Sequence, residues 1–132
     1  MQEIEVKEFP ESGYRPLVDF ESWRVAVLKY CADLKLENIR TMQYHAETDE
    51  AFILLQGQCS LFTGGVGPKI GELKKTGMEL HKVYVIKRGV WHNHSMSRDG
   101  EVLIVENSQT SDENSPIMEL SPEQQKCLHQ IG

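Results

Sequence analysis

Short runs of apolar or alternating residues, separated by turn residues, recur along most of the chain. They lie at residues 24–30, 39–45, 51–55, 59–63, 80–86, 90–96 and 101–106. Repeated short strands of this kind are typical of an all-β barrel or sandwich. The runs at 51–55 and 59–63 flank Gly57, and we expect them to form a hairpin across it. The glycine-rich residues 64–68 form a loop before the later strands.

The C-terminal part of the chain has a different pattern. Residues 107–116 are polar and are expected to form a loop. Pro122 follows Ser121, and Gln124 lies three residues after that serine, which is the signature of a capped helix start. We therefore expect a short helix ending at about Ile131. The predicted organisation is one domain over residues 1–132, with an N-terminal arm over about 1–20, a barrel over about 21–108, and a C-terminal loop and helix over about 109–132.

Composition narrows the range of functions. The chain has 132 residues and a formal net charge of −6, without a dense block of lysine and arginine, which excludes ordinary nucleic-acid binding. No apolar run approaches the length of a membrane span, and the charged N-terminus is unlike a signal peptide. Cys31, Cys59 and Cys127 are scattered and form no CxxC pair, which favours free thiols in a reducing cytosol. We expect a cytoplasmic protein with no nucleic-acid or membrane partner.

Strand alternation places several polar side chains on shared faces. His92 and His94 lie on one face of the run at 90–96, and Gln43 and His45 share a face of the run at 39–45. Glu50 shares a face with the apolar residues at 52 and 54. Two imidazoles and one carboxylate with open positions form a ligand set that suits Fe(II) and catalytic zinc. The faces follow from the sequence, whereas the convergence of these side chains depends on the fold.

Two stretches resemble the motifs of the cupins. In residues 45–57, His45, Glu50 and Gly57 match the second histidine, the glutamate and the glycine of the first cupin motif. Residues 87–92 resemble the second motif, Pro-x-Gly-x-x-His, with Lys87 in place of proline and His92 as its histidine. The resemblance implies a single RmlC-like cupin barrel, a double-stranded β-helix or jelly roll, with a short C-terminal helix.

The same resemblance implies a site and partners. It assigns His45, Glu50 and His92 as ligands of a divalent metal ion (Zn, Mn, Fe or Ni), with Gln43 as a weak oxygen ligand where the motif has its first histidine. His94 and Glu50 are the candidate proton-transfer residues, because they share this internal face. The implied partners are a small polar metabolite and a second copy of the chain. Residues 6–9 and 17–20 of the arm are expected to add a strand to the neighbour's sheet edge.

The activity stays open between several alternatives. Residues 45–53, the Gly-Val-Trp-His sequence at 89–92, and the strand that ends at Glu106 are similar to ureidoglycolate lyase, a cupin-like enzyme that forms glyoxylate and urea. The Thr-Asp-Glu sequence at 48–50 is similar to sugar or sugar-phosphate isomerase-like cupins. A cupin that binds a small molecule without catalysis and a purely structural barrel are further alternatives. Because barrel folds support many activities, the fold does not decide between them.

Overall fold

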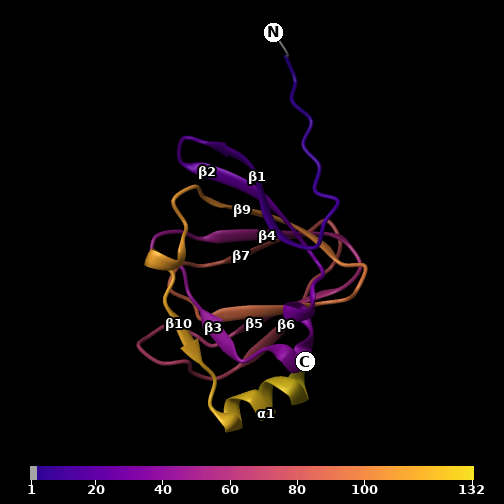
Figure 1. Ribbon diagram of the computed structural model, residues 1–132. Helices are drawn as coiled ribbons and strands as arrows, with labels where there is room; N and C mark the ends of the chain where they lie inside the picture. Colours follow the sequence, from indigo (N-terminus) through magenta and orange to yellow (C-terminus); the bar gives the residue numbers. More distant parts are fainter. Residues whose placement is uncertain (1–2) are drawn as a thin grey trace.

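The computed structural model describes residues 3–132 and shows two five-stranded sheets that face each other (Figure 1). The first sheet contains, in spatial order, β1 (Gly13–Phe20), β2 (Trp23–Lys29), β9 (Glu101–Asn107), β4 (Glu50–Gln56) and β7 (Val83–Ile86). The second contains β10 (Ile117–Glu119), β3 (Thr41–Gln43), β8 (His92–Met96), β5 (Cys59–Thr63) and β6 (Lys74–Gly77). Neighbouring strands within each sheet are antiparallel. The predicted all-β jelly roll is confirmed.

Apolar side chains fill the space between the two sheets. Strand alternation directs Ala26 and Leu28 of β2, Phe52 of β4 and Ile104 of β9 into this core, where each is at most 6% exposed. A second cluster lies on the opposite face of the second sheet, where Trp91 is buried. The interior of the sandwich is therefore largely apolar along its strands.

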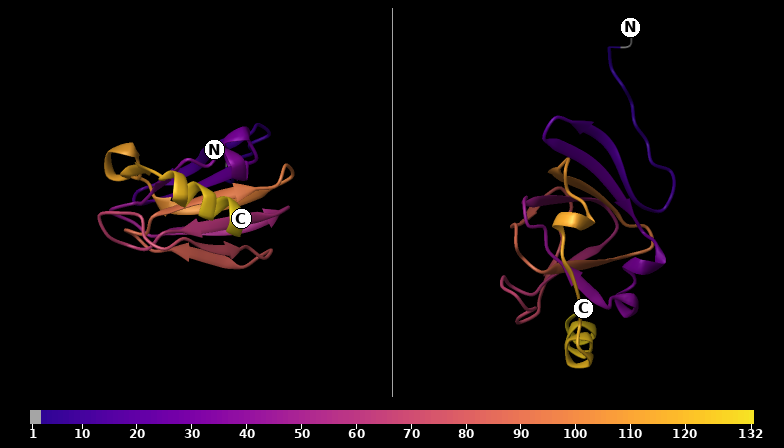
Figure 2. Two further views of the ribbon diagram at one scale, coloured as in Figure 1. Left: turned by 90° about the horizontal axis from the view of Figure 1, so that it is seen from below. Right: turned by 60° about the vertical axis from the view of Figure 1, so that its left-hand side comes forward.

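The C-terminal helix α1 (Pro122–Ile131) covers the outer face of the second sheet (Figure 2). Ser121 and Gln124 form the predicted capping box, and Leu128 is fully buried against that sheet. Three short 3₁₀ helices complete the described chain: η1 (Ala32–Leu34), η2 (Leu36–Asn38) and η3 (Asp112–Asn114). None of the helices in residues 3–132 has the length and hydrophobicity that crossing a bilayer requires.

The predicted hairpin across Gly57 is wrong. β4 pairs with β7 and β9 in the first sheet, whereas β5 pairs with β6 and β8 in the second. The chain thus crosses between sheets at Gly57, whose φ of 73° lies in the left-handed region. Sequence proximity suggested pairing, but the closed sandwich uses this turn as a corner.

The N-terminal arm is shorter than expected. Residues 13–20 form β1, which pairs with β2 of the same chain, so these residues are part of the first sheet. Residues 3–8 extend away from the body of the molecule (Figure 1), and Ile4 and Val6 there are 75% and 78% exposed. β6 and β10 were not expected either. β6 has only exposed residues and no apolar alternation, so its pairing with β5 is what makes it a strand.

Candidate functional site

Three buried polar residues from separate segments meet at one end of the sandwich. His45 follows β3, Glu50 begins β4 and His92 begins β8. They are 7%, 5% and 2% exposed, and one ligand atom from each lies within 4.8 Å of the others. Pairing of Gln43 with His92 brings β3 and β8 together in the second sheet, while Glu50 enters from the first sheet. The structure therefore brings together the three side chains that the cupin resemblance assigns.

Hydrogen bonds orient both imidazoles toward the carboxylate. His92 Nδ1 donates to the Val90 carbonyl at 2.9 Å, and His45 Nδ1 lies 2.8 Å from Ser115 Oγ. The opposite ring nitrogens then face Glu50. His45 Nε2 is 3.2 Å from Glu50 Oε1, and His92 Nε2 is 3.4 Å from the same oxygen. Outer partners of this kind fix the tautomer and ring orientation of metal-binding histidines.

This donor set fits a divalent metal ion. Nitrogen and oxygen ligands at about 2.1 Å from one ion lie roughly 3.0–3.4 Å from each other in octahedral or tetrahedral geometry. The two separations between Glu50 Oε1 and the imidazole Nε2 atoms match that spacing. Neutral imidazole and carboxylate also suit zinc, iron, nickel and manganese. His45, Glu50 and His92 are therefore the residues that would hold the ion.

Contacts within the triad shift the pKa values of Glu50 and His45. Burial raises the pKa of Glu50, but the hydrogen bonds of His45 and His92 outweigh this effect, so the pKa lies well below its usual range. Burial likewise opposes the charged form of His45, yet the hydrogen bond and charge of Glu50 raise the pKa of His45 above its ordinary value. The carboxylate is thus ionised under all ordinary conditions, which is the form that binds a cation.

The triad lies in the wall of a cavity of about 490 Å³. The lining residues are Tyr14, Arg24, Leu28, Gln43, His45, Glu50, His92, His94, Ile104, Glu106, Thr110, Ser111, Asp112 and Ser115. All five site residues expected from the sequence are among them. Gln43 lines the cavity, but its role as a metal ligand stays a prediction. A volume of this size is in the range that takes a small metabolite.

Glu106 is the main polar residue that the sequence analysis missed. It ends the buried face of β9 and is 6% exposed. Tyr14 Oη donates a hydrogen bond to Glu106, and Arg24 Nη1 lies 3.4 Å from Glu106 Oε1. Burial, together with the nearby Glu50, raises the pKa of Glu106 to about 7. The sequence pattern could have indicated this residue, because Glu106 continues the alternation that turns Val102 and Ile104 inward.

His94 also lines this cavity. Its ring packs edge-on against Phe52, with ring centroids 5.6 Å apart. Its Nδ1 is buried and has no hydrogen-bond partner among residues 3–132. Burial, followed by the neighbouring His92, lowers the pKa of His94 to about 4. His94 is therefore a neutral imidazole near pH 7, with one ring nitrogen unpaired.

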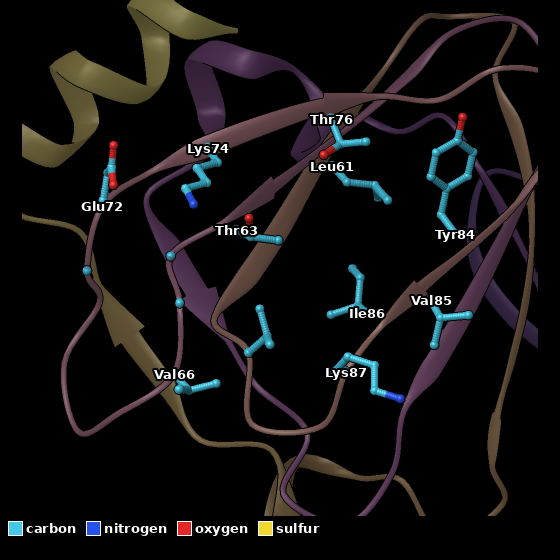
Figure 3. A pocket seen from close by; sticks show the side chains of 14 residues that line it. Leu61, Thr63, Val66, Glu72, Lys74, Thr76, Tyr84, Val85, Ile86 and Lys87 are labelled. Carbon is cyan, nitrogen blue, oxygen red and sulfur yellow. The ribbon is translucent and has the colours of Figure 1, made fainter.

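A second hollow of about 520 Å³ lies between β7 and the strands β5 and β6 (Figure 3). Its polar side chains include Glu72, Lys74 and Lys87, and Leu61 and Ile86 lie along its apolar wall. The hollow contains none of the five expected site residues and no histidine or cysteine. Although it is slightly the larger of the two, it lacks the ligand set that chemistry at a metal would need.

The comparisons with known proteins identify the fold. No protein-family model matches the chain, and no curated protein matches it by sequence. Among solved structures, a cupin-2 domain protein from Shewanella frigidimarina is 19% identical, with a TM-score of 0.53, covering 75% of this chain and 84% of that one. WlaRA from Campylobacter jejuni, a TDP-fucose-3,4-ketoisomerase, is 20% identical with a TM-score of 0.57, covering 74% and 68%.

The third comparison covers nearly the whole chain. PAC13 from Streptomyces, solved with uridine, is 10% identical with a TM-score of 0.59, and the match covers 93% of this chain and 96% of PAC13. Pac13 is described as a nucleoside dehydratase. At these identities the similarity concerns the fold, and the paired motifs and the buried triad agree with it. The protein therefore has the cupin fold.

Proposed function

We propose that this protein is a metal-dependent enzyme that acts on a small polar metabolite, in a lyase, dehydratase or isomerase type of reaction. The observation that carries the proposal is the convergence of His45, Glu50 and His92 within 4.8 Å in the buried wall of a cavity of about 490 Å³. A structural barrel has no need for three buried ionisable side chains with their donor atoms turned toward one point. Such clusters in a cavity mark functional sites.

The residues around the triad have different proposed roles. A bound divalent ion would act as a Lewis acid on a carbonyl or hydroxyl oxygen of the substrate. Ser115 and the Val90 carbonyl hold the two imidazoles in place. His94, whose Nδ1 has no hydrogen-bond partner among residues 3–132, is the candidate proton-transfer residue. Glu50 already contacts both imidazoles, so we assign it the role of metal ligand rather than that of proton-transfer residue.

The reaction class has support from the solved structures. WlaRA is a ketoisomerase of a nucleotide sugar, and Pac13 is a nucleoside dehydratase. Both activities concern hydroxyl-bearing compounds. They favour the sugar-directed alternative of the sequence analysis over the ureidoglycolate lyase alternative, although the lyase reaction belongs in the same assay panel.

Metal binding is the first test. We expect calorimetric titration of the metal-free protein with Ni²⁺ or Mn²⁺ to give one site per chain. His45→Ala should abolish it, whereas His129→Ala, which alters an exposed histidine on α1, should leave it unchanged. Equal binding by wild type and His45→Ala would place the ion elsewhere and remove the proposal.

Catalysis is tested separately. The metal-loaded protein is incubated in D₂O with free sugars, nucleosides and ureidoglycolate, and proton NMR follows product formation and exchange at carbon. We expect turnover or exchange that His94→Ala lowers at least tenfold while metal stoichiometry is kept. If neither product nor exchange appears with any compound, the non-catalytic binding alternative replaces the enzyme.

We further propose that two copies associate through the outer face of the first sheet. Two rows of apolar side chains cross this face: Val18, Val25, Val105, Ala51 and Val85 form one row, and Val27, Leu103, Ile53 and Val83 the other. Val83 and Val85 are 62% and 51% exposed. An antiparallel sheet with one face in water usually carries polar side chains there, so an apolar face of this extent favours a partner.

A second copy fits this face better than a partner of another kind. The chain carries a net charge of −6, yet the two apolar rows contain no acidic side chain, and the residue that continues the second row onto β1, opposite Val27, is the basic Arg15. At one end of the face, Lys29 and Glu101 neutralise each other at 3.0 Å. Two identical faces can therefore meet without acidic groups opposing each other. Residues 17–20 belong to β1, an edge strand of the first sheet, so strand addition through them stays a separate prediction.

Oligomeric state tests this surface. We expect sedimentation to show a dimer for wild type and a monomer for the double variant Val83→Glu/Val85→Glu, since both side chains are exposed and their replacement should not unfold a monomer. Val66→Glu, a 70% exposed position on the glycine-rich loop, is the matched control and should remain dimeric. A monomeric wild type would contradict the interface.

A further inference from the structure

The cavity beside the triad carries an unusual balance of charge. Three carboxylates line it, from Glu50, Glu106 and Asp112, and Arg24 is the one guanidinium or ammonium group among the described lining residues. Lys74 and Lys87 line the hollow of about 520 Å³ instead (Figure 3). Carboxyl groups therefore outnumber cationic side chains three to one among the described residues of this wall.

Arg24 is not free to bind an anion. Its Nε donates to Asp19 at 3.2 Å, and its Nη2 donates to the Ser108 carbonyl at 2.6 Å. Nη1 donates to the Thr110 carbonyl at 3.2 Å and also faces Glu106. A guanidinium has five N–H groups, and the protein takes four of them. Recognition of phosphate or carboxylate relies on two parallel N–H donors, and Arg24 cannot present such a pair.

The same wall contains groups that can form hydrogen bonds with the hydroxyl groups of a ligand. Glu106 accepts a hydrogen bond from Tyr14, and its carboxyl group lines the cavity. Thr110 Oγ1 and His94 Nδ1 are both buried, and neither has a hydrogen-bond partner within residues 3–132. Both residues line this cavity. Buried polar atoms are normally paired, so two unpaired atoms in one cavity wall indicate that a ligand supplies their partners.

We propose that the site takes an uncharged, hydroxyl-rich molecule of monosaccharide or nucleoside size, and that Glu106 and Thr110 determine this specificity by accepting and donating hydrogen bonds to its hydroxyl groups. Phosphorylated and carboxylated compounds are disfavoured, because they would face carboxylates without a free cationic donor. The inference rests on the proposed function for the position of the site. It deepens that function by naming the substrate class, and it sets aside a carboxylate substrate such as ureidoglycolate.

The experiment compares matched pairs of compounds that differ by one charged group. D-ribose is compared with D-ribose 5-phosphate, cytidine with cytidine 5′-monophosphate, and glucose with glucuronate. Saturation-transfer NMR and calorimetry measure the binding of each compound to both the metal-free and the Ni²⁺-loaded protein. We expect the neutral member of at least one pair to bind tenfold or more tightly than its charged counterpart, with a larger preference in the metal-free form.

Two variants test which residues cause the preference for neutral compounds. Glu106→Gln should lower the affinity for the neutral compound at least fivefold and reduce the ratio of its affinity to that of the charged compound. Thr110→Val should lower the affinity for the neutral compound and leave that ratio unchanged. Glu101→Gln is the control on the same strand, since this residue lies outside the cavity and pairs with Lys29. Its binding should match wild type.

The outcomes that contradict the metal function differ from those that contradict the substrate class. Absence of nickel binding would overturn the proposed metal function, while the preference for neutral compounds would still be measured in the metal-free protein. Charged members that bind as tightly as neutral ones, or no neutral compound bound in either form, would overturn the inference about substrate class and leave the metal site standing.

Discussion

His45 depends on Ser115 for its orientation. Ser115 is 3% exposed, and its Oγ lies 2.8 Å from His45 Nδ1. We predict that Ser115→Ala weakens Ni²⁺ binding by about 10–100-fold, the usual cost of losing an outer partner of a ligating histidine. Calorimetric titration measures the change. Ser95→Ala, on the same strand as His92, is the control and should bind as wild type does. An unchanged affinity in Ser115→Ala would contradict the positioning role.

Glu106 should make the protein less stable as pH rises. The folded pKa of about 7 lies above the ordinary value of 4.5, so between these values the folded state holds a proton that the unfolded state has lost. The resulting stability is present below about pH 4.5 and is lost as pH rises through 7. We predict that between pH 5 and pH 8 wild type loses about 2–3 kcal/mol relative to Glu106→Gln.

Urea unfolding at the two pH values measures this difference. Glu101→Gln serves as the control, because Glu101 is partly exposed and pairs with Lys29. Parallel pH profiles for wild type and Glu106→Gln would show that Glu106 does not hold its proton in the folded protein.

Motif spacing made the triad predictable, whereas the opposite wall required coordinates. His45, Glu50 and His92 stand at the positions of two short motifs, so their convergence followed once the strands formed a barrel. Glu106 stands alone at the end of an apolar strand, and Tyr14 lay in a segment interpreted as an arm. Their contact depends on the pairing of β1, β2 and β9, which local patterns do not encode.

The corner at Gly57 shows the same limit for a whole element. Alternation located β4 and β5 correctly but not the sheet to which each belongs. A Cβ atom at Gly57 would lie 2.7 Å from Asp99 Oδ1 and from Ser97 Oγ, because the turn packs against the one between β8 and β9. Contact with a segment so distant in sequence explains why a local hairpin was expected instead.

This packing gives a prediction about stability. Gly57→Ala combines a φ of 73° with close contacts, so we expect a loss of about 3 kcal/mol in the free energy of unfolding. Gly65→Ala has a similar φ of 72° but no atom within 4 Å of the added carbon, and should cost about 1 kcal/mol. Urea denaturation of both variants measures the difference. Equal losses would show that the close approach at Gly57 relaxes freely.

The molecule as a whole is two sheets joined at one end by the candidate metal centre. Glu50 belongs to the first sheet, His92 belongs to the second, and His45 follows a strand of the second. A metal ion there would bridge the sheets at the end where the cavity interrupts apolar packing. Ligand binding to the folded state alone adds stability, which is about 2.7 kcal/mol at a free concentration of 100 times Kd.

For a chain of 132 residues, that free energy corresponds to a rise in Tm of roughly 10 °C. We predict this rise for wild type with Ni²⁺, its loss in His45→Ala, and its retention in His129→Ala, whose histidine lies exposed on α1. Thermal unfolding followed by circular dichroism measures all three. Because the ion would have to detach before the sheets separate, unfolding in excess chelator should also begin at lower temperature. A rise of equal size in His45→Ala would mean that nickel stabilises the protein at another position and that the two sheets hold together without the bridge.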